Sequence, residues 1–162
     1  MDFDADHMDE YTPKEFSEIQ KHLDTNTVTW LNVDGLHDTD IITQIGDIFQ
    51  LDRKIVSDVL NTEQRPSAIE YDDCIFISLK MLQYDEVENE VNTENLSILL
   101  AKNLLISFQE KRGDVFDPVR ERIRKQKRKI RNSGTDYLSF TLLDIVIDNY
   151  MYIISLLGEK VE

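Results

Sequence analysis

The order of the predicted elements indicates an α+β fold or a layered α/β/α sandwich, with strands flanked by helices. Apolar residues recur at helical spacing between residues 38 and 60. Runs that are apolar on both faces, typical of covered strands, follow between residues 74 and 108, and helical patterns return from 117 to 157. With 162 residues and 41% hydrophobic content, the chain is long enough for one domain with a sizeable core.

The N-terminal segment is expected to contribute little to that domain. Residues 1–10 are acidic and short of apolar side chains, so we expect them to be disordered and the single domain to cover residues 11–162. Pro13 to Leu23 is expected to form a short helix, and Val28 to Val33 a strand.

Two capped helices are predicted next. Asp38 and Asp52 each precede a segment with apolar residues on one face, and an Asp side chain at that place accepts hydrogen bonds from the first free helical amides. The residues expected to face inward are Ile41, Ile42, Ile45, Ile48 and Phe49 in the first helix and Ile55, Val56, Val59 and Leu60 in the second. Asp58 then faces away from the core, within reach of solvent or a neighbouring subunit.

Three strands are predicted in the middle of the chain, at Cys74 to Gln83, Leu96 to Ala101 and Leu104 to Phe108. Lys102-Asn103 is short enough to turn the last two into a hairpin. The segment from Asp85 to Glu94 carries five carboxylates and no basic residue, so we expect an exposed loop there.

A basic helix is predicted after the strands. Between Arg120 and Arg131 there are eight Lys or Arg residues and one Glu, a charge of +7 in a protein of net charge −14. Asp117 is expected to cap this helix and Pro118 to occupy its first turn. A narrow apolar seam is formed by Val119, Ile123 and Ile130.

The last predicted helix, Tyr137 to Leu157, is apolar almost all round and, at about 1.5 Å per residue, about long enough to cross a membrane. Asp144 and Asp148 argue against a span, since each would cost about 2.5 to 3.5 kcal/mol near mid-bilayer with no basic partner nearby. We therefore expect a helix covered on several sides by protein. The two carboxylates are four residues apart, so they project from one face and suit a hard cation such as Mg²⁺.

Composition makes several function classes unfavourable. The strong negative charge disfavours nucleic acid and anionic membranes as partners and favours cations or basic proteins. The single Cys74 fits a reducing, cytosolic location. The scattered His residues and isolated glycines form neither a metal-ligand spacing nor a phosphate loop, so we expect no enzyme.

Several separated motifs, in order, resemble the cytosolic domain of CorA-type magnesium and cobalt transport proteins. These motifs are Thr29-Trp30-Leu31-Asn32, Gly35-Leu36-His37, Asp58-Val59-Leu60-Asn61, Gln64-Arg65-Pro66, Gln109-Glu110-Lys111, Gly113 to Arg124 and Asp136-Tyr137-Leu138. The resemblance covers Tyr11 to Leu157 and implies an α/β/α sandwich. The family's pore-forming helices and its Gly-Met-Asn signature do not occur in these residues. The resemblance therefore implies a soluble cytosolic fragment whose stalk and transmembrane helices lie outside it.

The resemblance also implies a function and a site. The implied function is a divalent-metal-sensing domain of an Mg²⁺/Co²⁺ channel, located at the cytoplasmic face of the cell membrane. Asp58 is then expected to face a stalk carboxylate of a neighbouring subunit across a bridging divalent ion, which is Mg²⁺ or else Co²⁺ or Ni²⁺. Asp144 matches a second family position near that interface, and Ser57 stands where some relatives have Glu.

The same resemblance implies a homopentamer for the full-length protein and a monomer or dimer for the fragment, with membrane contact only through the missing helices. Two alternatives stay open. The chain could be a freestanding module whose basic helix binds an acidic partner, or a small metal-dependent hydrolase.

Overall fold

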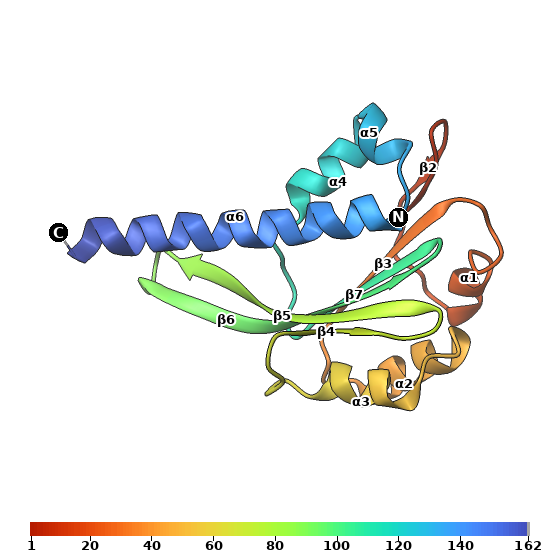
Figure 1. The fold of residues 1–162 in the computed structure, drawn as a ribbon, viewed down its shortest axis with the longest axis horizontal. Coiled ribbons are helices and arrows are strands. Elements are labelled where there is room, and N and C mark those ends of the chain that lie inside the picture. Colours follow the sequence, from red (N-terminus) through yellow and green to blue (C-terminus); the bar gives the residue numbers. More distant parts are fainter. Residues whose placement is uncertain (162) are drawn as a thin grey trace.

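One mixed sheet of seven strands organises the computed structural model, which describes residues 1–161 (Figure 1). The strand order is β2-β1-β3-β7-β6-β5-β4. The bounds are Asp2–Phe3 for β1, Met8–Asp9 for β2, Val28–Asp34 for β3, Ser67–Glu70 for β4, Cys74–Asp85 for β5, Glu90–Ala101 for β6 and Leu104–Gln109 for β7. β3 and β7 pair in parallel, whereas the other neighbours are antiparallel.

Helices cover both faces of this sheet, which confirms the predicted fold class. The bounds are Phe16–Gln20 for α1, Thr39–Ile48 for α2, Arg53–Leu60 for α3, Asp117–Arg124 for α4, Arg128–Arg131 for α5 and Thr135–Val161 for α6. In Figure 1, α2 and α3 lie below the sheet and α4, α5 and α6 above it. Because successive strand residues point to opposite faces, β6 and β7 supply Leu96 and Leu105 to the core under α6, and Leu99 and Ile106 to the core over α2 and α3.

The caps of α2 and α3 are as predicted. Asp38 Oδ1 accepts a hydrogen bond from the Ile41 amide at 3.3 Å, and Asp52 Oδ1 accepts one from the Lys54 amide at 2.7 Å. The two helices contact each other at Gly46, where a Cβ atom would lie 2.6 Å from Val56 Cγ2. A residue without a side chain is therefore required at this crossing.

The N-terminal residues are ordered in the structure, so the prediction of disorder for residues 1–10 is wrong. β1 and β2 form a hairpin that extends the sheet beyond β3, and Phe3 is 1% exposed in the core under α6. Arg131, which is far away in the sequence, donates hydrogen bonds to the Asp4 and His7 carbonyls. Local composition predicted a free end because the composition of residues 1–10 does not show that Arg131 binds them.

The acidic segment from Asp85 to Glu94 is mostly strand, which corrects the predicted loop. β5 continues to Asp85 and β6 begins at Glu90, so only residues 86–89 form the turn. Helix α6 contacts this extension near its C-terminal end, because Lys160 donates hydrogen bonds to the Tyr84 hydroxyl and to Asn89 Oδ1. The long hairpin depends on a helix that the local sequence does not report.

The basic segment forms two helices rather than one. The chain breaks at Gln126, which has a φ of 53° between α4 and α5. Pro118 lies in the first turn as predicted, but Asp117 is not the cap, since the N-cap is Phe116 and makes no side-chain cap bond. Asp117 and Asp114 instead bind Arg120, at 2.9 and 2.6 Å. The predicted apolar seam is buried: Val119, Ile123 and Ile130.

Only one side of α6 is covered by the described protein, so the prediction of cover on several sides is wrong. The helix packs along the long hairpin and extends past it (Figure 1). Its exposed apolar residues are Phe140, Ile147, Met151, Tyr152, Ile154, Leu157 and Val161. By length and composition α6 could cross a membrane, and 22% of its most apolar stretch is buried against the domain.

Candidate metal site on helix α3

Asp58 lies on α3 beside the residues that anchor this helix. Ile55 and Val59 point into the core and are 0% and 1% exposed, whereas Ser57 is exposed and Asp58 is half-buried. The Oδ2 atom of Asp58 is buried and has no hydrogen-bond partner among residues 1–161. A buried carboxylate oxygen without a donor is costly, so this site favours a donor group or a cation. The structure thus places Asp58 at the edge between core and solvent, whereas the sequence predicted a side chain directed away from the core.

Tyr71 is a neighbour of Asp58 that the sequence analysis missed. It follows β4 in the turn before β5, and its ring packs against the apolar cluster that contains Ile55 and Val59. Its hydroxyl is buried and lacks a hydrogen-bond partner among the described residues. Burial raises the pKa of Tyr71, and the charges of Asp58 and Asp52 raise it further. The sequence held no signal for this contact, because it joins a helix to a turn that begins several residues later.

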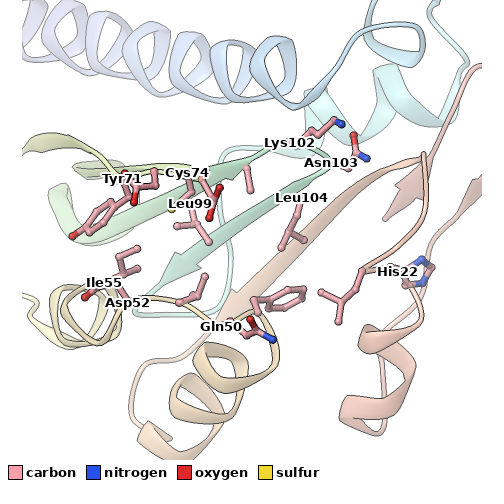
Figure 2. A pocket seen from close by; sticks show the side chains of 16 residues that line it. His22, Gln50, Asp52, Ile55, Tyr71, Cys74, Leu99, Lys102, Asn103 and Leu104 are labelled. Atoms are coloured by element: carbon pink, nitrogen blue, oxygen red, sulfur yellow. The ribbon is translucent and has the colours of Figure 1, made fainter.

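A cavity of about 650 Å³ opens next to this region, between the start of α3, the β4–β5 turn and the β6–β7 turn (Figure 2). Asp52, Asp72 and Asp73 bring carboxylates to its lining, and Lys102 brings one cationic group. The Asp52 carboxylate is used by the α3 cap. Cys74 is half-buried there, and burial raises the pKa of its thiol, so the thiol stays protonated at neutral pH.

Asp144 and Asp148 are not brought to Asp58 within one copy of the chain. Both are exposed on α6, on the opposite side of the sheet from α3 (Figure 1). The sequence predicted apolar surroundings for these two carboxylates, and the apolar residues around them are largely those on the exposed face of α6 itself. Among residues 1–161, no group of three His, Cys, Asp or Glu side chains is placed to hold a metal ion. A divalent ion at Asp58 would therefore need ligands from another subunit or segment.

Part of the basic segment is occupied by contacts inside the domain. Arg120 binds Asp114 and Asp117, Arg124 binds Glu10 at 2.6 Å, and Arg131 is bonded to backbone carbonyls. Arg122 and Lys127 are exposed and make no ion pair with the described residues. The segment thus anchors the N-terminal hairpin, and fewer of its charges remain for an external partner than the sequence indicated.

Comparison with known proteins identifies the family. A sequence model described as CorA-like Mg²⁺ transporter protein matches residues 25–162, most of the chain. The chain belongs to the CorA family. It is 35% identical over 162 residues to the cobalt/magnesium transport protein CorA of Thermotoga maritima, covering 100% of this chain and 46% of that protein. This CorA domain therefore spans about half the length of the curated relative that it matches.

Solved structures show the same fold. The soluble domain of CorA from Methanocaldococcus jannaschii superposes with a TM-score of 0.71 at 15% identity, covering 98% of this chain and 60% of that one. The ZntB cytoplasmic domain from Vibrio parahaemolyticus gives a TM-score of 0.69 at 20% identity, covering 99% and 64%. The predicted resemblance and fold class are confirmed. The matching family consists of transporters rather than enzymes, in agreement with the prediction that the chain is not an enzyme.

Proposed function

We propose that this CorA domain is the cytosolic, divalent-metal-sensing part of a magnesium and cobalt channel. In the complete protein, the single domain would be followed by stalk and membrane-spanning helices, so that it lies at the cytoplasmic face of the cell membrane. The observation that carries the proposal is the place of Asp58 on α3: its side chain is half-buried at the border between core and solvent, and no ion pair with residues 1–161 neutralises its charge. The family relationship supports it, since the related Thermotoga protein is named as a cobalt/magnesium transporter.

The chemistry of sensing follows from the charge of Asp58. We propose that the carboxylate faces an acidic group on the stalk of a neighbouring subunit, with Mg²⁺, or alternatively Co²⁺ or Ni²⁺, between them. Two carboxylates about 4 Å apart repel by about 1 kcal/mol in water and about 4 kcal/mol at an effective dielectric constant of 20. A bridging divalent cation replaces this repulsion by attraction, and carboxylate oxygens are the ligands that Mg²⁺ prefers.

The ring of subunits makes this contact regulatory. In the proposed homopentamer, each bridge would hold two neighbours together, so that plentiful cytosolic Mg²⁺ favours a closed ring. When Mg²⁺ falls, repulsion loosens the ring and favours conduction, which is negative feedback through linked equilibria. Asp144 and Asp148, exposed one turn apart on α6, are proposed as auxiliary ligands at the subunit boundary.

The test is protection of the complete protein against proteolysis as Mg²⁺ is titrated. Asp58→Asn keeps the size of the side chain but removes its charge, and we expect the Mg²⁺ concentration at half-protection to rise at least about tenfold. Asp47→Asn is a matched control, because Asp47 is exposed on the neighbouring α2. An unchanged midpoint for Asp58→Asn would exclude Asp58 from the sensor.

A further inference from the structure

Tyr71 is held against α3 by both its backbone and its ring. Its amide donates a hydrogen bond to the Cys74 carbonyl at 2.8 Å, which closes the turn between β4 and β5. The ring packs against the apolar cluster that contains Ile55 and Val59, and in Figure 2 it projects from this turn towards α3 beside Ile55. Asp58 lies on the same helix, between these two core residues. Its position is set by the fold rather than by a flexible surface loop.

The polar groups of the two residues are complementary. The Tyr71 hydroxyl is a hydrogen-bond donor, the Asp58 Oδ2 atom is an acceptor, and both are buried without a partner among residues 1–161. Leaving both unpaired is unfavourable, whereas one hydrogen bond between a hydroxyl and a carboxylate would satisfy both and is among the stronger neutral-to-charged bonds. The charge of Asp58 also contributes to the raised pKa of Tyr71, which places the two groups within electrostatic reach of each other. No hydrogen bond joins the two groups in the structure, so the pairing requires a change in side-chain torsion angles.

We propose that Tyr71 is a positioning residue for Asp58: its hydroxyl donates to Oδ2 and leaves Oδ1 as the single oxygen presented to the regulatory cation. This inference rests on the proposed function, in which Asp58 binds that cation. Fixing one oxygen reduces the freedom that the carboxylate loses on binding, so the site is pre-organised.

The arrangement also bears on which cation is sensed. Ca²⁺ accepts both oxygens of a carboxylate in flexible geometries, whereas Mg²⁺ binds one oxygen from each of one or two carboxylates and keeps several waters. With Oδ2 occupied by Tyr71, Asp58 offers one oxygen and suits the small, partly hydrated ion. Tyr71 therefore favours Mg²⁺ over Ca²⁺ at this site.

The experiment compares Mg²⁺ and Ca²⁺ in the proteolytic protection of the complete protein. Tyr71→Phe keeps the ring packing and removes only the hydroxyl. We expect the Mg²⁺ midpoint to rise about three- to tenfold, as for loss of one charge-assisted hydrogen bond, and the Ca²⁺ midpoint to change less than about twofold. Tyr84→Phe is the control, because the Tyr84 hydroxyl donates to Asn89 and accepts from Lys160 at the far end of the hairpin, away from Asp58. A merely structural role for Tyr71 would change both midpoints equally or neither.

A double-mutant cycle separates this inference from the function on which it rests. In the Asp58→Asn background, Tyr71→Phe should have no further effect, because the charged acceptor is already gone. Additive effects of the two substitutions would overturn the pairing of Tyr71 with Asp58, as would a Tyr71→Phe midpoint equal to that of the control. If Asp58→Asn itself leaves the midpoint unchanged, the proposed function fails first.

Discussion

Arg131 links the N-terminal hairpin to the rest of the domain, and its removal should destabilise the fold strongly. The side chain is 5% exposed and donates three hydrogen bonds to backbone carbonyls. They reach Asp4 at 2.6 Å, His7 at 2.8 Å and Ile123 at 2.9 Å. Two of these acceptors lie in the turn between β1 and β2, and the third lies at the end of α4. One guanidinium group thus connects two elements that no backbone pairing joins.

The size of the effect follows from these three contacts. A hydrogen bond to a charged group contributes about 1.5 to 3 kcal/mol, and a buried acceptor that loses its donor bears the full desolvation penalty. The Asp4 and His7 carbonyls can regain water after Arg131→Met, whereas the Ile123 carbonyl is buried. We therefore expect the free energy of unfolding to fall by about 3 to 5 kcal/mol, a large share of the total stability of an ordinary domain.

The assay is urea unfolding followed by circular dichroism, with hydrogen exchange of the Asp4 amide as a local readout. This amide donates to the His7 carbonyl at 3.0 Å, so its exchange should speed up when the hairpin is released. Arg128→Met is the matched control, because Arg128 is exposed and its side chain makes no ion pair or hydrogen bond with residues 1–161. A loss within about 0.5 kcal/mol of the control would refute the reasoning.

Two further predictions concern packing and pH. Gly46→Ala should lower the free energy of unfolding by about 1 to 2 kcal/mol, because the new Cβ atom meets the stiff Val56 side chain. Gly158→Ala, whose Cβ atom has free space, should raise the free energy of unfolding by about 0.5 kcal/mol. Equal effects of the two substitutions in urea unfolding would contradict this prediction. Glu94 is 6% exposed, and burial raises its pKa above 4.5, so the folded state holds the proton more tightly and the free energy of unfolding falls as the pH rises through that pKa. The side-chain amide oxygen of Glu94→Gln can still accept a hydrogen bond from the Lys111 amide, but the variant has no carboxyl group to titrate, so it should lose this fall in stability with pH. If the stability difference between the variant and the wild type does not change with pH, the fall does not come from Glu94.

Contacts between residues close in sequence were predicted well. The Asp38 and Asp52 caps, the inward face of α3, most of the inward face of α2 and the turn at Lys102-Asn103 all depend on neighbours within a few positions. Ile41 is the exception, because it was expected to face inward and is 37% exposed. The alternation of residues along β6 and β7 likewise follows from the geometry of a strand. The helical repeat also placed Asp58 on the flank of α3, but the burial of its Oδ2 atom was not predicted.

Errors arose where a distant residue supplies the missing partner. Residues 1–10 are ordered through Arg131 and the edge of β3, and the end of the long hairpin is contacted by Lys160 of α6. The break at Gln126 likewise lets Arg131 turn back towards the N-terminal hairpin. None of these partners lies within the window that a local pattern covers.

The sequence by itself therefore determined the family, the fold class and the flank of α3 on which Asp58 lies, because each follows from local periodicity or from motifs in a set order. Only the tertiary structure decided that Asp58 and Tyr71 share one face of the sheet, while Asp144 and Asp148 lie across it on α6. The physical reason is that strand pairing and helix packing set such distances. Both bring together residues that are far apart in the sequence, and the number of residues between two positions does not indicate their distance in the fold.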